Sequence, residues 1–416
     1  MSSEFHDVIV IGAGPGGATV ANLLAQQGLD VIIIDRGVQP HPQIPQTCFG
    51  LRSPLLSRLG IAEKFPTAIK EPQPVRFVVA DDTCDIQITV KLSQPTNDYR
   101  GMCLNRSEFD QLLVNSAIAH GVTYASASPV EALISTDKQI TGVRCRTSET
   151  VQEYQGKAVI DASGKFSLIP AYLGLKEESN QLDERIAVFS HFVHPAFREL
   201  LPDGGMTVIA VDGGYILIAP LLGDRVSVVT VLDQAKATAY GSDRAQLFHT
   251  LIATWKPLAE AIAVSEQVLP VLPVINKTWT CRQFSGSGFL VVGEAGVFAD
   301  PFFSNGVAVA MDSGEIAADT LAACLKQGEA WTHEGFAAYD DQLRTLFQQR
   351  QQEAKTWLDS LPLQQLRMSC ADPHLPWGVP LAFLNLIAGI GSTNQTRLTT
   401  PTSAMMVARQ AYASIS

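Results

Sequence analysis

The chain has 416 residues, enough for two or three domains with large hydrophobic cores. Its composition, 46% hydrophobic and 17% charged residues, is typical of a globular protein, and a net charge of −11 without a basic cluster argues against nucleic-acid binding. Seven scattered cysteines without a C-x-x-C pair indicate a reducing compartment and argue against a disulfide framework or a zinc site.

The N-terminal segment combines a buried strand, a glycine-rich turn and a helix. Residues 8–11 are apolar without alternation, as in a strand covered on both faces. The turn holds three glycines in G-x-G-x-x-G spacing and leads into a helix at about 15–27, whose N-terminus can receive phosphates. A second apolar strand, 31–34, ends in a carboxylate placed to accept ribose hydroxyls. This pattern predicts a dinucleotide site formed by Gly12, Ala13, Gly14, Pro15, Gly16, Gly17, Asp35 and Arg36.

The rest of the chain predicts two interleaved domains. In chain order we expect a loop over 36–54, a short helix at 54–59, strands within 73–92, a helix over 106–120, a strand from 121, a hairpin over 140–160, one antiparallel sheet over 185–275 crossed by a helix at 243–263, a buried strand at 288–294, and helices at 307–327 and 333–359.

The expected fold class is therefore α/β. A Rossmann-type domain with a three-layer parallel sheet is interleaved with an antiparallel-sheet substrate domain and followed by a helical C-terminal segment. The predicted boundaries are 1–72, 100–170 and 280–330 for the first domain, 73–99 and 171–279 for the second, and 331–416 for the helical segment.

Neither an export signal nor a spanning helix is expected. No apolar run reaches the roughly 18 residues that a spanning helix needs. The first strand begins within ten residues of Met1, too early for a signal peptide to precede it. We therefore expect a cytoplasmic protein. The apolar run 375–391, broken by prolines, leaves three alternatives open: core, the roof of an apolar pocket, or peripheral contact with a membrane.

Four pieces in chain order resemble the FAD-dependent oxidoreductases of the aromatic-hydroxylase type, a superfamily that includes flavin-dependent halogenases and geranylgeranyl reductases. The pieces are the glycine turn with its carboxylate, an arginine that opens a helix, the sequence Asp-Ala-Ser-Gly, and Gly-Glu followed by Asp-Pro. The resemblance implies a flavoprotein with FAD as cofactor. The further cofactor-binding residues that it implies are Arg106, Val130, Asp161, Gly164, Gly293, Glu294, Pro301, Gly306 and Val307.

Some of these assignments have plain alternatives. Arg106 could instead be a surface arginine that pairs with Glu108 or Asp110, and Val130 could be an ordinary strand residue. Glu294 stands where the family usually has an aspartate, so its reach toward the ribityl hydroxyls differs by one methylene. The helix that begins near Gly306 would direct its positive dipole end at the flavin pyrimidine ring.

Three residues are candidates for catalysis. Cys48 lies in a segment similar to the cysteine loop of geranylgeranyl reductases, where a cysteine lies against the flavin, although it could be only a small buried hydrophobe. Tyr215 is a candidate proton donor. Lys70 falls roughly where halogenases have a catalytic lysine, although a solvated loop lysine is the simpler interpretation. His191 and His194 face opposite sides of a strand, so no metal site is predicted.

The predicted substrate pocket lies along residues 215–220, where both family motifs are broken. Halogenases carry two tryptophans here and prenyl reductases a tyrosine and a tryptophan, whereas this chain keeps only Tyr215. Leu217 and Ala219 share a face with it because strand side chains alternate. We expect Leu217, Ala219, Phe302 and Phe303 to line the pocket, since Asp300–Val307 closely resembles the halogenase segment near flavin and halide.

The resemblance and these residues predict an FAD-dependent oxidoreductase that acts on an apolar or aromatic small molecule. Monooxygenase-type chemistry is the leading prediction, with a flavin-dependent halogenase or a geranylgeranyl-reductase-like alkene reductase as alternatives. A non-catalytic flavin-binding module is the alternative of another class. Because no second glycine motif is present, electrons would come from briefly bound NAD(P)H or from a separate flavin reductase.

Overall fold

The computed structural model describes residues 2–39, 46–64, 75–80, 85–88, 99–104, 106–137, 139–146, 150–178, 185–202, 205–221, 224–240, 243–274, 279–298, 306–327 and 335–360. The chain divides into two compact units. Unit 1 comprises residues 1–66, 105–179 and 277–350, and unit 2 comprises residues 67–104, 180–276 and 351–416. Unit 1 thus extends beyond the predicted boundaries at 170 and 330.

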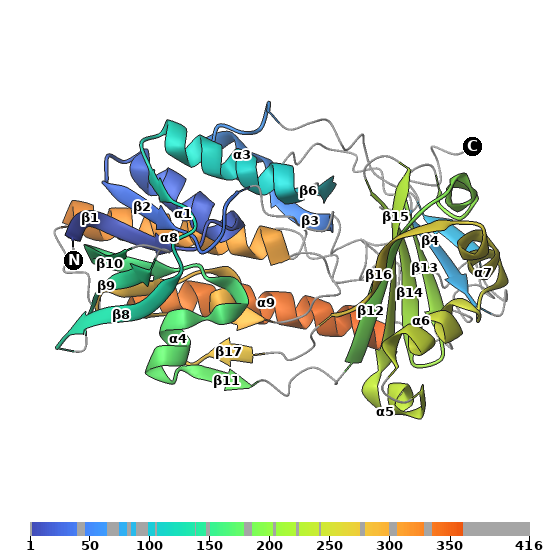
Figure 1. Cartoon of the computed structure of the whole chain (residues 1–416). Coiled ribbons are helices and arrows are strands. Elements are labelled where there is room, and N and C mark those ends of the chain that lie inside the picture. The colour runs from blue at the N-terminus through green and yellow to red at the C-terminus, as the bar shows by residue number, and fades with distance from the viewer. Residues whose placement is uncertain are drawn as a thin grey trace, which may run out of the picture. The chain divides into compact units, whose positions relative to one another are not determined.

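Unit 1 is built on a mainly parallel sheet (Figure 1). Its parallel strands lie in the order β19 (Phe289–Val291), β10 (Val151–Asp161), β1 (Ser2–Ile11), β2 (Val31–Ile34) and β7 (Thr123–Ala125), and the short β18 (Ser285–Gly286) adds an antiparallel edge. The central strands are apolar on both faces because both faces are covered, and Val8, Ile9 and Val10 are fully buried. The expected Rossmann-type arrangement is confirmed.

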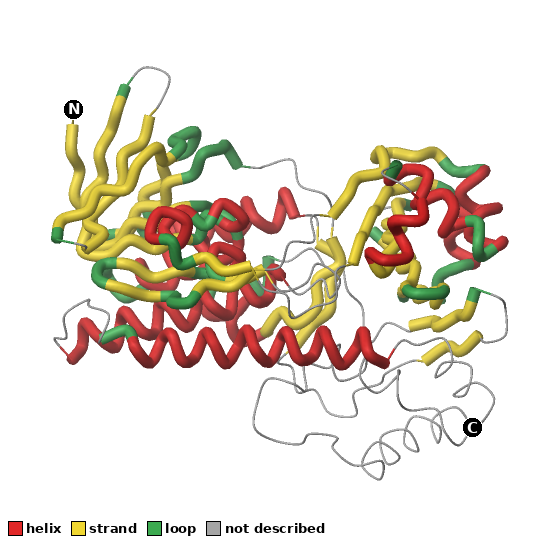
Figure 2. The backbone as a smooth tube through the Cα atoms, turned by 90° about the horizontal axis from the view of Figure 1, so that it is seen from below, coloured by secondary structure: helices red, strands yellow, loops and turns green. Residues whose placement is uncertain are grey.

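Different layers cover the two faces of this sheet. The helices are α1 (Pro15–Ala25), α3 (Arg106–Ala119) and α8 (Gly306–Gln327), with α1 packed between the other two. The opposite face supports the antiparallel hairpin β8 (Val130–Thr136) and β9 (Gln139–Arg146), whose apolar side chains join those of β1 and β2 in one core. Figure 2 shows this layer of strands beside the layer of helices. The predicted three-layer domain follows from this stacking.

Unit 2 contains a seven-stranded sheet. Its order is β16 (Glu266–Val274), β12 (Arg185–Val193), β15 (Arg225–Asp233), β14 (Gly214–Pro220), β13 (Met206–Val211), β4 (Val75–Val79) and β5 (Asp85–Ile88). All neighbours are antiparallel except β13 and β4, which are parallel. The parallel pair arises because β4 belongs to an earlier segment of the chain and reaches β13 by a long connection. The antiparallel sheet expected over 185–275 is confirmed, and the parallel pair is added by β4, which lies outside that range.

One face of the unit 2 sheet packs against two helices. They are α6 (Arg244–Ile252) and α7 (Lys256–Ala263), whose apolar side chains form a common core with β12, β14 and β15. The sequence pattern predicted a single helix over 243–263, but the structure divides it at Trp255. Pro257 explains the break, because proline has no N–H to donate to the carbonyl four residues earlier and its ring clashes with that carbonyl, so it is tolerated only in the first turn of a new helix.

The remaining elements are short, apart from one long helix. They are β3 (Gln46–Arg52), α2 (Ser53–Arg58), β6 (Tyr99–Leu104), η1 (Gly164–Phe166), α4 (Leu168–Leu173), β11 (Lys176–Glu178), η2 (Pro195–Glu199), α5 (Gln234–Ala237), η3 (Thr238–Tyr240), β17 (Trp279–Cys281), η4 (Gly293–Ala295), β20 (Val297–Phe298) and α9 (Ala337–Ser360). In α9, the hydroxyl of Tyr339 donates to the carbonyl of Val291 at 2.6 Å, which docks this helix on β19.

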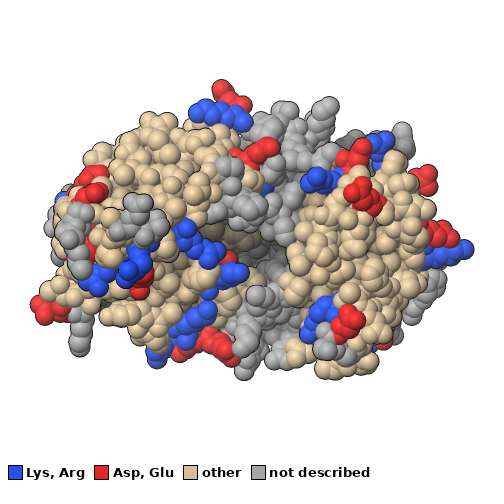
Figure 3. All heavy atoms as spheres, in the orientation of Figure 1, with Lys and Arg blue, Asp and Glu red and all other residues tan. Residues whose placement is uncertain are grey.

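The surface and the helices also bear on localisation and partners. Among the described residues, no helix is long and apolar enough to cross a membrane. On the face drawn in Figure 3, acidic and basic side chains of the described residues are interspersed. An extended basic surface of the kind that binds nucleic acid is not seen on that face.

Candidate cofactor and active site

The glycine turn after β1 shows which of its glycines the protein itself requires. Gly12 has φ +104°, and a Cβ there would lie 2.4 Å from the carbonyl oxygen of Ala162. A Cβ on Gly17 would lie 2.0 Å from the carbonyl oxygen of Gly12. At Gly14, by contrast, no atom of the described residues other than its chain neighbours lies within 4 Å of the Cβ position. The space in front of Gly14 is therefore available to a ligand, as the pyrophosphate assignment requires.

The N-terminus of α1 is open for an anion. Gly14 is its N-cap residue, makes no side-chain cap, and no acidic residue stands in the first turn. The backbone N–H groups of this turn and the helix dipole therefore face the same open space. A phosphate group there would satisfy these amides.

Asp35 fixes the glycine turn to the end of β2. One of its carboxylate oxygens accepts the N–H of Ala13 at 2.6 Å, and the other accepts the N–H of Gly37 at 2.8 Å. The side chain is buried, beside the space in front of Gly14. The next residue, Arg36, is exposed, and its guanidinium carbon lies 4.1 Å from the ring centre of Phe166. Contact of Asp35 with ribose stays a prediction.

Asp161 at the end of β10 organises the next turn. Its carboxylate accepts the backbone N–H groups of Ser163 at 3.0 Å and Ile169 at 2.6 Å. Burial raises the pKa of this carboxyl, which has no exposed surface. The carboxylate therefore shapes the turn, and a part of Asp161 in cofactor binding stays a prediction. Gly164, at φ +64°, then brings the backbone of the turn close to Glu294.

Glu294 lies at the point where β19 meets the helix α8. The N–H of Gly293, whose φ is +63°, donates to the hydroxyl of Ser313 on α8 at 2.9 Å. The Glu294 side chain is accessible to solvent, yet burial raises the pKa of its carboxyl, while the charges of Lys165, Arg106 and Lys176 lower it. The Glu294 carboxyl thus lies near three basic side chains and is reachable from solvent, and its contact with the ribityl chain stays a prediction.

Arg106 contributes a largely buried positive charge. Its guanidinium binds the Asp110 carboxylate through two contacts, Nε to Oδ1 at 3.0 Å and Nη2 to Oδ2 at 2.9 Å. Only 13% of the Arg106 side chain and 2% of the Asp110 side chain are exposed. The pairing with Asp110 thus exists, but not at the surface. The Arg106 charge also lowers the pKa of Glu294 and of Cys48, so Arg106 lies in the neighbourhood of both side chains.

Cys48 lies at the first turn of α8. The N–H of Ala308 bonds to its sulfur, and the thiol is completely buried. Burial raises the pKa of Cys48 to about 12, although Arg106 acts in the opposite direction. The thiol is therefore protonated at neutral pH.

An ion-pair network that the sequence analysis missed holds the Cys48 segment against α8. Arg52 binds Asp312 at 2.7 Å and also pairs with Glu315. Arg58 pairs with Glu315 and binds Asp319 at 2.9 Å. The three carboxylates stand at i, i+3 and i+7 on α8, so the signal in the sequence was an acidic stripe on one helix face opposite two arginines.

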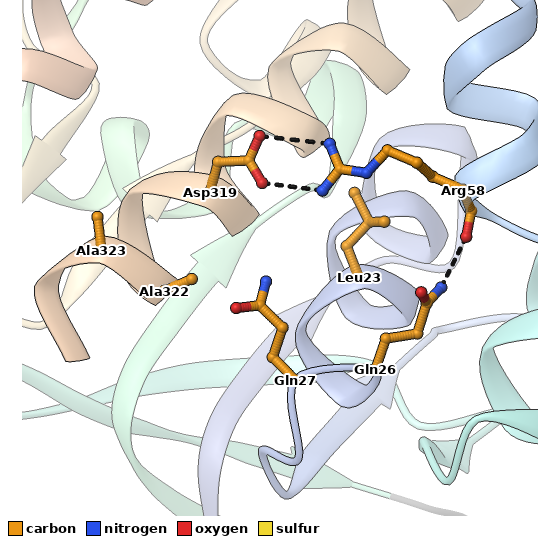
Figure 4. Close-up of a pocket in the computed structure, with 7 residues that line it drawn as sticks. All are labelled: Leu23, Gln26, Gln27, Arg58, Asp319, Ala322 and Ala323. Atoms are coloured by element: carbon orange, nitrogen blue, oxygen red, sulfur yellow. Dashed lines mark hydrogen bonds and ion pairs between the residues drawn. The ribbon is translucent and has the colours of Figure 1, made fainter. Parts of the chain in front are cut away.

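A pocket of about 560 Å³ lies beside this network (Figure 4). It is lined by residues from the ends of α1, α2 and α8: Leu23, Gln26, Gln27, Arg58, Asp319, Ala322 and Ala323. Gln26 donates to the carbonyl of Arg58 at 2.9 Å, and the Arg58 guanidinium faces Asp319. None of the predicted cofactor residues lines it, so this pocket is distinct from the candidate site.

The predicted pocket strand is β14 in unit 2. Ile216 and Ile218 face the core beneath α6 and α7, and Tyr215, Leu217 and Ala219 therefore occupy the other face. Tyr215 and Ala219 are buried, whereas Leu217 is only half-buried. Leu217 is thus not part of the helix-side core. That this face meets the cofactor stays a prediction.

Several predicted site residues lie outside the described residues: Lys70, Pro301, Phe302 and Phe303, together with the run 375–391. Val130 begins β8, is half-buried and pairs with Cys145. Gly306 and Val307 begin α8 as expected, with Val307 buried. Within the described part of the chain, no cluster of three or more His, Cys, Asp or Glu could hold a metal ion.

The sequence matches the profile of the FAD binding domain family over residues 6–353. The chain belongs to this family. FAD is accordingly its cofactor, and the open space at Gly14, the α1 amides and the accessible Glu294 carboxyl fit a long dinucleotide. The residues that would hold FAD are those of unit 1 described above. The protein is an FAD-dependent enzyme of the oxidoreductase type, as its relatives indicate.

Its relatives include halogenases and prenyl reductases. The 1H-pyrrole-2-carbonyl-(peptidyl-carrier protein) chlorinase of Pseudomonas fluorescens is 23% identical over 376 residues, which cover 83% of this chain and 81% of the relative. The corresponding brominase of Pseudoalteromonas luteoviolacea is 26% identical, with 82% of each chain covered. A digeranylgeranylglycerophospholipid reductase of Methanocella arvoryzae is 25% identical, with 83% and 84% covered.

Solved structures share the fold of this FAD-binding protein. The flavin-dependent brominase Bmp2 superposes with a TM-score of 0.75 at 19% identity, covering 99% of this chain and 100% of the other. The flavin-dependent halogenase CmlS gives 0.75 at 24% identity, with 99% and 78% covered. A geranylgeranyl bacteriochlorophyll reductase-like protein of Thermoplasma acidophilum gives 0.69 at 18% identity, with 98% and 96% covered.

Proposed function

We propose that this enzyme halogenates an electron-rich aromatic substrate, presented as an acyl group on a carrier protein, with electrons from a separate flavin reductase. The observation that carries the proposal is twofold. Residues 300–307 resemble the halogenase segment near flavin and halide, and two relatives that match over four-fifths of both chains are named as halogenases of a carrier-bound pyrrole-2-carbonyl group. The proposal therefore keeps the flavin- and O₂-dependent chemistry of the monooxygenase-type prediction. The atom added to the substrate ring is a halogen and not oxygen.

In this reaction the residues of unit 1 bind and orient the cofactor. The α1 amides and the open backbone at Gly14 would hold the pyrophosphate, Asp35 the adenosine ribose and Glu294 the ribityl chain. Arg106 adds a partly desolvated positive charge to the same site, which favours an anionic group nearby. When bound, FAD supplies two-electron redox chemistry and the reduction of O₂.

The net reaction balances without any further oxidant. Reduced FAD, O₂, one halide ion, one aromatic C–H group and one proton give oxidised FAD, the halogenated ring and two molecules of water. The protein must keep water from the reacting groups, and apolar side chains of the substrate site, for which Leu217 and Ala219 are the predicted residues, would do so. The electron donor is proposed as a partner because the sequence carries one glycine motif only.

Cys48 supports a second candidate, an alkene reductase. A neutral thiol with a pKa of about 12, held at the N-terminus of α8, can serve as a hydrogen-bond donor but gives up its proton reluctantly. A reductase of this kind would need it, or Tyr215, to protonate the carbon that does not receive hydride. The same buried thiol is also compatible with simple packing, which is why halogenation is placed first.

The test compares the two chemistries in one preparation. The FAD-loaded protein is given NADH, a flavin reductase, air and bromide, with pyrrole-2-carbonyl carrier protein as substrate, and the carrier is examined by mass spectrometry. A second arm offers a geranylgeranyl lipid with dithionite under argon. Bromine incorporation supports the proposal, saturation of the lipid in the second arm supports the reductase, and hydroxylation of the carrier-bound ring supports a monooxygenase. Reoxidation by air without turnover of any substrate supports a passive flavin module.

A further inference from the structure

The sheet of unit 2 has two faces of different character. Its first face packs beneath α6 and α7 through residues such as Val188, Ile216 and Val228. Because strand side chains alternate, their neighbours Phe189, Leu217 and Val229 belong to the second face. All three of these apolar side chains are half-buried. The second face therefore presents apolar side chains that its own helices leave uncovered.

The strand register arranges the second face in rows across β12, β15 and β14. The apolar row consists of Phe189, Val229 and Leu217, each paired with the next. The adjacent row is polar at one end: His191 pairs with Ser227, and Ser227 pairs with Ala219. One step further along the strands, Val193 pairs with Arg225, which is exposed. An apolar row is thus bordered by three side chains that can donate hydrogen bonds, namely His191, Ser227 and Arg225.

His191 is the unusual member of this group. It is only 5% exposed, and no hydrogen bond joins either of its ring nitrogens to another described residue. Its one recorded ring contact is with Phe189, with centroids 5.8 Å apart. Burial, with the nearby charge of Arg225, lowers the pKa of His191 to about 4, so the imidazole is neutral and offers one donor and one acceptor. A nearly buried imidazole with no hydrogen-bond partner among the described residues is able to receive a ligand.

Ser227 strengthens this interpretation. Its side chain is half-buried beside His191, and no hydrogen bond from its hydroxyl to a described residue is present. Two neighbouring polar groups that have no hydrogen-bond partner among the described residues, next to an apolar row, match a ligand with one oxygen-bearing end and one flat apolar body. Arg225 at the rim adds a positive charge, so the oxygen that fits is an acceptor and not a donor.

We propose that His191 and Ser227 bind the acyl oxygen of the substrate, while Phe189, Val229 and Leu217 receive its aromatic ring. The proposal rests on the proposed function, because it takes the second face as the substrate face. Two sources share this chemistry: the carboxylate of a free aromatic acid and the carbonyl of a thioester. Arg225 distinguishes them, since its charge favours a carboxylate far more than a neutral carbonyl.

The experiment measures binding to the FAD-loaded protein by calorimetry, without turnover. The probes are pyrrole-2-carboxylate, its N-acetylcysteamine thioester and unsubstituted pyrrole. The variants are His191→Phe, which keeps an aromatic ring but removes both nitrogens, His191→Gln, which keeps a donor and an acceptor, Ser227→Ala and Arg225→Gln. The matched control is His249→Phe on α6, where the histidine is exposed.

We expect His191→Phe and Ser227→Ala each to weaken the binding of an acyl probe about tenfold and to leave that of pyrrole unchanged. His191→Gln should recover much of the loss, and His249→Phe should bind like the wild type. If Arg225→Gln weakens the binding of the acid but not of the thioester, and the acid binds the wild type more tightly, the natural ligand is a free aromatic acid. If the thioester binds at least as tightly as the acid, the natural ligand is the acyl group carried as a thioester on a carrier protein.

The proposal is overturned if no acyl probe binds the wild type, or if His191→Phe binds the acyl probes as the wild type does. Failure of the proposed function is a separate result. It is read from bromide-dependent product formation in the same preparations, whereas the binding data need only a folded, yellow protein. Loss of FAD from a variant would be visible as loss of flavin absorbance. If His191→Phe loses FAD, the binding of the acyl probes is compared between His191→Gln and the wild type.

Discussion

A matched pair of single-methyl substitutions separates cofactor binding from folding at the glycine turn. In Gly17→Ala the new Cβ would lie 2.0 Å from the carbonyl oxygen of Gly12, a backbone atom that cannot rotate away. In Gly14→Ala the new Cβ meets no atom of the described residues beyond its chain neighbours within 4 Å, and the φ of −69° is accessible to alanine. Gly17→Ala should therefore lower the free energy of unfolding of the protein, whereas Gly14→Ala should lower only its affinity for FAD.

The magnitudes follow from these distances. Overpacking at Gly17 should cost about 1–3 kcal/mol of the free energy of unfolding, a fall in the melting temperature of roughly 2–4 °C for each kcal/mol. Gly14→Ala should change the stability of the apoprotein by no more than about 1 kcal/mol, since a lost helix cap and a less flexible unfolded chain oppose each other. The same overpacking against bound pyrophosphate should weaken FAD binding about 5- to 150-fold.

The assay is thermal unfolding of each apoprotein together with FAD titration followed by quenching of flavin fluorescence. Tight FAD binding by Gly14→Ala would refute the placement of the pyrophosphate at this backbone. Wild-type stability of Gly17→Ala would refute the packing argument. Equal loss of stability in both variants would show that the space at Gly14 serves folding and not the cofactor.

Two further substitutions and one labelling experiment test the roles assigned to Arg106, Cys48 and Leu217. Arg106→Ala should weaken FAD binding roughly tenfold to a hundredfold, because a charge-assisted contact contributes about 1.5–3 kcal/mol. If the variant keeps all its flavin after prolonged dialysis, Arg106 serves only to pair with Asp110. Cys48 in the folded protein should resist alkylation by iodoacetamide below about pH 10, because its thiol has a pKa of about 12 and is buried, whereas urea-unfolded protein should react near the ordinary thiol pKa; rapid labelling of the native protein at pH 8 would contradict this. Leu217→Trp should exclude an aromatic substrate but retain FAD, and normal turnover by this variant would place the substrate elsewhere.

Local sequence patterns were sufficient for the parts of the fold that depend on neighbouring residues. The glycine turn, α1 and β2 follow each other within about 30 residues, so the apolar runs and the position of Asp35 predicted them directly. The alternation around β14 likewise placed Leu217 and Ala219 on one face. Here the periodicity of the strand carries the information, and no distant contact is needed.

The parts that the sequence did not reveal depend on distant contacts. Residues 46–52 were expected to be loop, but they form β3, whose Arg52 pairs with Asp312 some 260 residues away. The parallel pairing of β4 with β13 also joins segments far apart in the chain. No local pattern indicated that the Asp161 carboxylate would bond to the backbone of Ser163 and Ile169, whereas its part in cofactor binding stays a prediction. His191 was considered only as a metal ligand, because its strand partners Ser227 and Leu269 are invisible without the register.

The most direct test of the proposed halogenation needs no knowledge of the natural substrate. The FAD-loaded protein is reduced under argon and mixed with aerated buffer containing phenol as a trap, with and without bromide, and both hydrogen peroxide and bromophenol are quantified. The account predicts that bromide diverts electrons from hydrogen peroxide to bromophenol. An equal yield of hydrogen peroxide with and without bromide, and no bromophenol, would contradict it.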